Sequence, residues 1–195
     1  MPTSQYNQNY IFKIDAVIRK SLIAHNRTSA IRIDLRFPTK VNFHSNDSKA
    51  ITRFIESLKA KVDADLKRKS NKWGRHCSSH VNYIWVKEIG EKNNNKHYHL
   101  LLLVNKDIYH TLGNYDQDEP NLGIFIQQAW CSAINAAYPE NRYLVHFPDN
   151  PTYWLDANSS EIENQISALN KRCLYLAKHH TKQYGEGERS FGCSR

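Results

Sequence analysis

Residues 79–104 read SHVNYIWVKEIGEKNNNKHYHLLLLV, and this stretch decides the fold because it predicts a β-hairpin. The first run, 79–89, and the second, 97–104, are rich in the β-branched, aromatic and aliphatic side chains that favour strands. Between them, residues 90–96 are glycine, asparagine and charged residues, which suit a polar reversal of the chain. The near-continuous apolar run from Leu100 to Val104 indicates that the second strand is buried.

Helices and strands are predicted on both sides of this hairpin. Aliphatic and charged side chains alternate over 30–37, which predicts a half-buried strand. Apolar stripes at helical spacing predict four helices. In chain order, the predicted elements are a helix at 6–24, a strand at 30–37, a helix at 48–69, the hairpin, a helix at 121–138, a strand at 142–147 and a helix at 159–182. This order predicts an α+β fold with a central, mostly antiparallel sheet and helices on one face.

The charge balance favours a polyanionic partner. The 195 residues contain 27 Lys and Arg against 19 Asp and Glu, which gives a formal net charge of +8. Nucleic acid is the commonest partner of so basic a chain. A solvated lysine face would produce the same balance, so the charge alone does not identify the partner.

The sequence also indicates where the protein acts. No apolar run approaches the length of a membrane span, and the N-terminal segment MPTSQYNQNY lacks the layout of a signal peptide. The four cysteines, at positions 77, 131, 173 and 193, are too scattered for a zinc ribbon or a disulfide framework. We therefore expect a cytoplasmic domain with free thiols and no membrane partner.

Two histidines at the start of the second hairpin strand are candidate metal ligands. Side chains two residues apart on a strand point to one face, so His97 and His99 project together. The hairpin would bring Glu88 opposite them, which gives a His/His/Glu set with room for water and a phosphate oxygen. The carboxylate makes Mg²⁺ acceptable, and the imidazoles favour Mn²⁺. The alternative is a pair of exposed histidines at a hairpin end, with Glu88 paired to a lysine.

A tyrosine in the last predicted helix is a candidate nucleophile. The apolar stripe of that helix forms its core-facing side, and Tyr175 falls nearly opposite it, on the same side as Lys171, Lys178 and Lys182. A phenol has an ordinary pKa near 10 and is a poor nucleophile at neutral pH. We expect the neighbouring cations to lower the pKa of Tyr175. The alternative is a surface tyrosine on a solvated basic face.

Together these two segments resemble the motifs of the HUH endonucleases, which initiate rolling-circle replication or plasmid transfer. The run HYHLLLL at 97–103 matches the family's histidine–bulky–histidine strand, and YLAK at 175–178 matches its tyrosine-x-x-lysine helix. The strand at 31–37 lies where the family has its first strand motif. Glu88 matches a position at which several replication initiators supply a third metal ligand.

Within that superfamily the chain is most similar to the inovirus (filamentous-phage) replication-protein-like group of bacterial prophages, of the YagK/YfjJ C-terminal domain type. The segments WVKE at 85–88 and SFGCSR at 190–195 carry this similarity, which covers roughly 29–195. It implies a split βαβ sheet of the ferredoxin or RRM type. The domain organisation expected from it is an N-terminal helical addition at 1–28, an HUH endonuclease-like domain at 29–185 and a polar tail at 186–195.

The resemblance implies that the protein nicks and rejoins DNA. Glu88, His97 and His99 would hold a divalent metal, Mg²⁺ or Mn²⁺, that polarises the scissile phosphate. Tyr175 would attack single-stranded or melted origin DNA, form a 5′-phosphotyrosine bond and free a 3′-hydroxyl for a polymerase. Lys178 would steady the phosphate.

The same resemblance implies the partners of the protein. The residues expected to contact DNA are Lys171, Arg172 and Lys182. The DNA would be a single strand or an origin hairpin, and a host helicase or polymerase would be a further partner. No small-molecule cofactor is expected.

One departure from the family limits the expected chemistry. Some phage initiators carry two tyrosines as Tyr-x-x-Lys-Tyr-x-x-Lys, whereas here His179 stands in the place of the second tyrosine. A single tyrosine cannot carry two DNA ends at once, so we expect nicking and covalent capture rather than a full replication cycle. Three alternatives stay open: a non-catalytic prophage DNA-binding protein on the same fold, a transposase of the same chemistry, and an unrelated metallohydrolase.

Overall fold

The predicted hairpin forms and supplies the central strand of the fold. A computed structural model describes residues 5–38, 47–90, 95–117, 119–178 and 189–194. β2 (Asn82–Ile89) and β3 (Lys96–Asn105) pair antiparallel, with Val86 opposite His99 and Glu88 opposite His97. The backbone N–H of Gly90 donates to the carbonyl of Asn95 at 3.0 Å and closes the reversal.

In the described residues, six strands form one sheet in the order β4-β1-β3-β2-β6, and β5 pairs with the other end of β1. The remaining strands are β1 (Arg27–Arg36), β4 (Val145–His146), β5 (Thr152–Asp156) and β6 (Phe191–Cys193). β1 and β2 both pair antiparallel with β3, so they run in the same direction on either side of it. A helix connects them, which makes a split βαβ unit. The α+β class and the antiparallel sheet are therefore confirmed.

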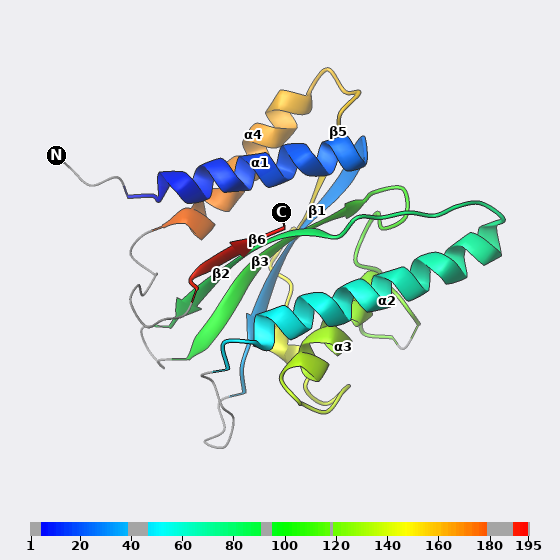
Figure 1. Cartoon of the computed structure of the whole chain (residues 1–195), viewed down its shortest axis with the longest axis vertical. Helices are drawn as coiled ribbons and strands as arrows, with labels where there is room; N and C mark the ends of the chain where they lie inside the picture. The colour runs from blue at the N-terminus through cyan, green and yellow to red at the C-terminus, as the bar shows by residue number, and fades with distance from the viewer. Residues whose placement is uncertain (1–4, 39–46, 91–94, 118, 179–188, 195) are drawn as a thin grey trace.

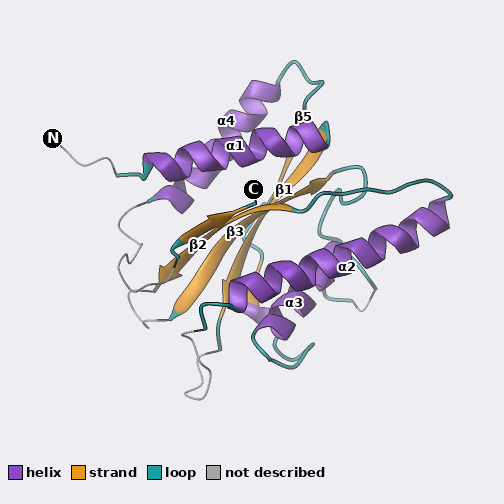
Figure 2. Cartoon of the chain, viewed as in Figure 1, coloured by secondary structure: helices purple, strands orange, loops and turns teal. Residues whose placement is uncertain are grey.

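The apolar side chains of β3 point alternately into two cores, one on each face of the sheet. Leu100, Leu102 and Val104 belong to a core that includes α2 (Ala50–Trp73) and α3 (Leu122–Ala133). Leu101 and Leu103 belong to a second core that includes α1 (Gln8–Ala24) and α4 (Ile162–Cys173). The two pairs of helices lie on opposite sides of the sheet (Figures 1 and 2).

Helices thus cover both faces of the sheet, where the sequence predicted them on one. The reason is that the second face of the sheet also carries apolar side chains, among them Ala30 of β1 and Leu101 of β3, and these need a cover. α1 supplies part of that cover, so residues 8–24 pack into the same fold as the rest of the chain. The α1 residues in this core are Ile14, Val17, Ile18 and Leu22.

Two helices end earlier than predicted. α3 ends at Ala133, and Asn135 just beyond it adopts a positive φ of 55°. α4 ends at Cys173 and continues as a short 3-10 segment, η2 (Leu174–Ala177). The predicted end of that helix, at 182, lies outside the described residues. Among the helices that the structure describes, none is both long enough and apolar enough to cross a membrane.

Two strands, β5 and β6, are not predicted by the sequence pattern, and the predicted strand at 142–147 is a 3-10 turn, Arg142–Leu144, followed by the short β4. β6 falls in the segment expected to be a polar tail. A Cβ at Gly192 would lie 2.5 Å from atoms of the Trp85 indole. The glycine therefore lets β6 lie against β2 over that ring, and a three-residue strand is too short to show an alternating pattern.

Two isoleucines of α1 test whether this helix is part of the cooperative core. Ile18 is 0% exposed and Ile23 is 86% exposed. Because Ile18→Ala leaves a cavity, we expect it to lower the free energy of unfolding by about 2–5 kcal/mol, measured by urea denaturation. Ile23→Ala removes the same atoms from the solvent side and should change it by less than about 0.5 kcal/mol. Equal effects of the two variants would contradict the packing of α1 on the sheet.

Candidate metal centre and nucleophile

The hairpin register brings the three predicted metal ligands together. Even-numbered residues of β2 and odd-numbered residues of β3 point toward α1 and α4, as Ile84 and Leu101 do. Glu88, His97 and His99 continue these two rows beyond the apolar core. Glu88 lies opposite His97 and diagonally across from His99 in the ladder. The strand pairing alone therefore brings all three side chains together.

The geometry of the three side chains fits a divalent cation. One ligand atom from each of Glu88, His97 and His99 lies within 4.8 Å of the other two. Oε2 of Glu88 lies 3.0 Å from Nε2 of His99 and 3.5 Å from Nε2 of His97. Glu88 is 3% exposed and His99 is 8% exposed, whereas His97 is partly open to solvent. A buried carboxylate beside two imidazole nitrogens is a donor set suited to Mn²⁺, Zn²⁺ or, less well, Mg²⁺.

Asp34 of β1 joins the site, although the sequence did not predict it. β1 pairs Asp34 with His99, and the Asp34 carboxylate hydrogen-bonds Nδ1 of that imidazole. This bond leaves Nε2 directed at Glu88, as in the carboxylate–histidine pairs that orient metal ligands. The available signal was a carboxylate on the charged side of the predicted strand at 30–37, but its neighbour across the sheet depends on the pairing of β1 with β3.

The charges around Asp34 explain why it is ionised. Burial works to raise the pKa of the Asp34 carboxyl, but the hydrogen bond and charge of His99 and the charge of Arg32 lower it to about 2. The guanidinium of Arg32 lies 3.6 Å from Asp34, and Nδ1 of His146 lies 3.4 Å from it. For His99, burial works to lower the pKa, but its hydrogen bonds to Asp34 and Glu88 raise it.

Tyr175 reaches the same site from η2. Its hydroxyl donates to Oε2 of Glu88 at 3.2 Å, and its ring meets that of His99 edge-on at 5.2 Å between centroids. The residue is 38% exposed, so the phenol is open to solvent on one side. The end of α4 at Cys173 matters here, because the tighter 3-10 turn is the segment that carries Tyr175.

The pKa of Tyr175 shifts in the direction opposite to the one expected. Burial, followed by the charge of Glu88 and the hydrogen bond to it, raises the pKa of the phenol to about 12. Arg32, rather than the neighbouring lysines, is the cation that opposes this rise. Without a cation near Glu88, Tyr175 is therefore a firmly protonated hydrogen-bond donor.

The predicted basic residues are distributed unevenly around the site. Lys178 is half-buried, and its Nζ lies 5.2 Å from the centre of the Tyr175 ring. Lys171 and Arg172 are exposed on α4, and Lys171 lines a shallow cavity with Arg19 and Glu163 at the side of α1. Lys182 lies outside the described residues.

Comparison with known proteins identifies relatives over nearly the whole chain. Residues 3–194 match the family model of the YagK/YfjJ C-terminal domain. The chain is 39% identical to the "Uncharacterized protein YagK" of Escherichia coli (strain K12), over 95% of this chain and 92% of that protein. It is 37% identical to the "Uncharacterized protein YfjJ" of the same strain, over 95% of this chain and 93% of that protein. No solved structure matches the chain.

A titration with Mn²⁺ tests the assigned ligands. We expect one equivalent to bind, Glu88→Gln to abolish binding, and Asp34→Asn to weaken it roughly 10- to 100-fold because His99 loses its orienting partner. Affinity should rise with pH, since the ion displaces a proton from His99, whose pKa is raised. Isothermal titration calorimetry measures both effects.

The matched control for this titration is His110→Ala, which removes an exposed imidazole stacked on Trp154. It should leave Mn²⁺ binding unchanged. Unaltered binding by Glu88→Gln would show that the ion sits elsewhere and would contradict the assignment.

Proposed function

The chain belongs to the YagK/YfjJ C-terminal domain family, and we propose that it nicks single-stranded or melted DNA in the manner of the HUH endonucleases. The observation that carries this proposal is the 3.2 Å contact between the Tyr175 hydroxyl and Glu88. It brings a partly exposed phenol against the same carboxylate that meets both imidazoles. A nucleophile beside a potential cation site is the arrangement that a metal-assisted transesterification requires.

The proposed reaction exchanges one phosphodiester for another. The Tyr175 oxygen forms a bond to the scissile phosphorus, and the bond from phosphorus to the 3′-oxygen breaks. The products are a 5′-phosphotyrosine and a 3′-hydroxyl, which receives the proton that the phenol gives up. No nucleoside triphosphate is consumed, and the reverse reaction rejoins the strand.

The residues of the chain divide the work of this reaction. Glu88, His97 and His99 would hold the divalent cation, which, when bound, supplies the positive charge that polarises the scissile phosphate. Asp34 keeps His99 oriented through Nδ1. Lys178, beside the Tyr175 ring, is assigned to the phosphate oxygens.

The raised pKa of Tyr175 gives the proposed site an inactive resting state. The Glu88 charge and burial keep the phenol protonated in the metal-free chain. Any interaction that draws negative charge away from Glu88 removes one of the causes of this shift. Cleavage should therefore depend steeply on the concentration of the metal.

We propose that the activity takes place in the cytoplasm and that its substrate is the DNA of an inovirus-like prophage.

The decisive experiment tests whether the protein forms a covalent adduct with DNA. Single-stranded oligonucleotides from the DNA that flanks the gene, labelled at their 3′ ends and incubated with Mn²⁺, should yield a labelled adduct that survives denaturing electrophoresis, because the fragment 3′ of the cleavage site stays bonded to the tyrosine. Tyr175→Phe should abolish it, because the attacking oxygen is lost. Tyr143→Phe, at a tyrosine that is 66% exposed on the surface, should leave the adduct yield unchanged.

An adduct formed by Tyr175→Phe would overturn the assignment of the nucleophile. Absence of the adduct from the wild-type chain, together with tight DNA binding and no affinity for divalent ions, would favour the second candidate function. This is a non-catalytic DNA-binding protein on the same fold. The observation in its favour is that Glu88 is already hydrogen-bonded to both His99 and Tyr175.

A further inference from the structure

We propose that a groove on the α2 side of the sheet binds a single strand of nucleic acid without any metal. It runs between α2 and the edge formed by β2 and β6, and it ends at the basic C-terminal end of α2. We call it the α2 groove. This inference deepens the proposed function, since it takes the same DNA as its ligand, but it needs neither Tyr175 nor the metal ligands.

The C-terminal end of α2 is the most basic segment of the described chain. Residues 67–76, KRKSNKWGRH, contain five lysines and arginines and no acidic residue. Two of these cations, Arg68 and Lys69, pair with the buried Asp65, which also accepts a hydrogen bond from Tyr109 at 2.9 Å. These pairs hold the helix end in place and account for part of the charge.

Three cations of this segment are left for a partner. Lys67, Lys72 and Arg75 are exposed, and in the parts of the chain that the structure describes no carboxylate lies within ion-pair distance of them. Three unpaired cations within nine residues, with no anion between them, create a local positive potential. A phosphate backbone is the partner that such a potential attracts most strongly.

Two adjoining cavities extend from this basic helix end and could hold a nucleic-acid strand. One, of about 760 Å³, lies at the helix end between α2 and the segment that follows it; its donors include Lys67, Ser70, Asn71, His76 and Ser78. The other, of about 800 Å³, continues along α2 toward β6. Asp63, Ser79 and His80 line both cavities, so the two form one continuous groove.

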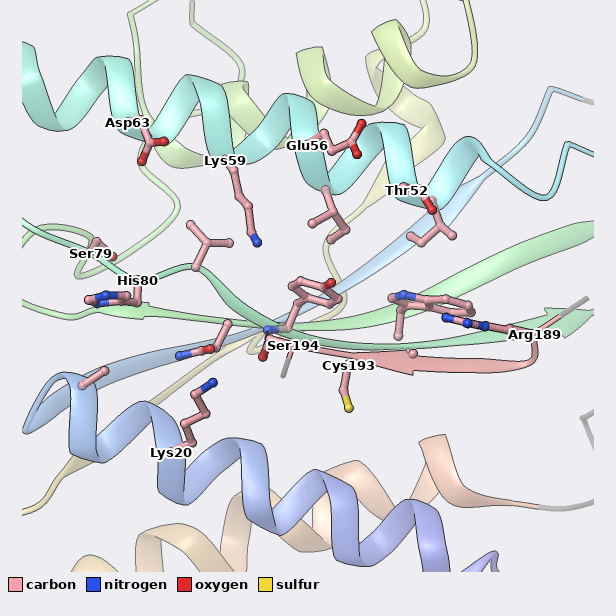
Figure 3. Close-up of a pocket in the computed structure, with 18 residues that line it drawn as sticks. Lys20, Thr52, Glu56, Lys59, Asp63, Ser79, His80, Arg189, Cys193 and Ser194 are labelled. Carbon is pink, nitrogen blue, oxygen red and sulfur yellow. Dashed lines mark hydrogen bonds between the residues drawn. The ribbon is translucent and has the colours of Figure 1, made fainter.

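The second cavity combines cations with aromatic rings. Figure 3 shows Lys59 reaching in from α2 and Lys20 from α1, with the β6 edge between them and Arg189 at one end. Nζ of Lys59 lies 5.6 Å from the centre of the Tyr83 ring. The two acids of the groove, Glu56 and Asp63, are outnumbered by the four lysines and arginines that line it, at positions 20, 59, 67 and 189.

An exposed tryptophan extends the aromatic surface beyond the groove. Trp73 is 41% exposed at the end of α2, and the Arg75 guanidinium lies 5.3 Å from the centre of its ring. Bases of a single strand stack on such rings whatever their sequence, and each stack is worth about tenfold or more in affinity. A duplex keeps its bases stacked inside and gains nothing from these rings, so the ligand that fits this surface is a single strand.

The groove leads toward the metal centre from the other face of the sheet. Trp85 lines the groove, and Glu88 lies three residues further along β2. At about 3.3 Å per residue, the two are separated by roughly 10 Å along the strand. One strand of DNA that follows the groove therefore arrives at the sheet edge next to the candidate metal centre.

The test measures the binding of a fluorescein-labelled 20-nucleotide oligothymidine by fluorescence anisotropy, in EDTA and over a series of salt concentrations. The triple variant Lys67→Gln, Lys72→Gln, Arg75→Gln removes the unpaired cations of the α2 end at which the groove finishes, of which Lys67 also lines the groove; we call it the groove variant, and it should bind at least tenfold more weakly. The slope of log affinity against log salt should become shallower by about 2, since each lost single-strand phosphate contact contributes about 0.7.

A charge-matched control separates the groove from general electrostatics. The variant Lys61→Gln, Lys106→Gln, Arg142→Gln removes three cations that neither line the groove nor belong to residues 67–76, and it should weaken binding by less than threefold. The oligonucleotide should also quench tryptophan fluorescence, and Trp73→Phe should reduce this quenching, because the ring on which a base stacks is no longer an indole. Equal losses in the two triple variants, or tighter binding of a duplex of the same length, would overturn the inference.

The outcomes also distinguish this inference from the proposed function. Tyr175→Phe should bind the oligonucleotide like the wild-type chain while forming no adduct. The groove variant should bind Mn²⁺ normally, which shows that it is folded, and should form less adduct only at low DNA concentration. Normal anisotropy without any adduct defeats the proposed function alone, whereas a normal adduct with unaltered anisotropy in the groove variant defeats the groove alone.

Discussion

The antiparallel register of β2 against β3 is the constraint on which the rest of the structure depends. Side chains on a strand alternate between its two faces, so a shift of one residue would turn Glu88 away from His97 and His99. The same shift would exchange the residues that β2 presents to its two cores. Apolar packing on both faces therefore holds the metal ligands in register, because a slip would move Trp85 and Ile84 each into the opposite core as well as separate the ligands.

The central position of β3 spreads this constraint through the fold. β1 pairs with β3 on the side opposite β2, which places Asp34 behind His99. α4 packs on the face that carries the triad, and its 3-10 extension brings Tyr175 to Glu88. Buried cations and carboxylates then balance one another: Arg32 is 5% exposed beside Asp34, and the carboxylate stays ionised.

Those parts of the site that depend on local spacing were predictable from the sequence. The His97 and His99 pair follows from strand periodicity, Glu88 follows from folding the hairpin back, and Tyr175 was singled out by its place opposite an apolar stripe. Asp34 was not predictable, because its role depends on which strand lies beside β3. The second helical layer was missed for a similar reason, since the alternation at 30–37 placed Arg32 on an exposed face, whereas α1 and α4 cover it.

The shift in the pKa of Tyr175 shows how tertiary placement overrides a local pattern. The spacing of lysines around Tyr175 suggested a lowered pKa, but the ring lies against Glu88, and burial together with that carboxylate raises the pKa.

The contact between Tyr175 and Glu88 also joins the candidate nucleophile to the candidate metal ligands, so the central claim is that Tyr175 and a cation share one site. Anomalous diffraction from crystals grown with Mn²⁺ tests it most directly. The account predicts one peak bounded by Glu88, His97 and His99 with the Tyr175 hydroxyl beside it; a peak elsewhere, or a Tyr175 remote from the ion, would contradict it.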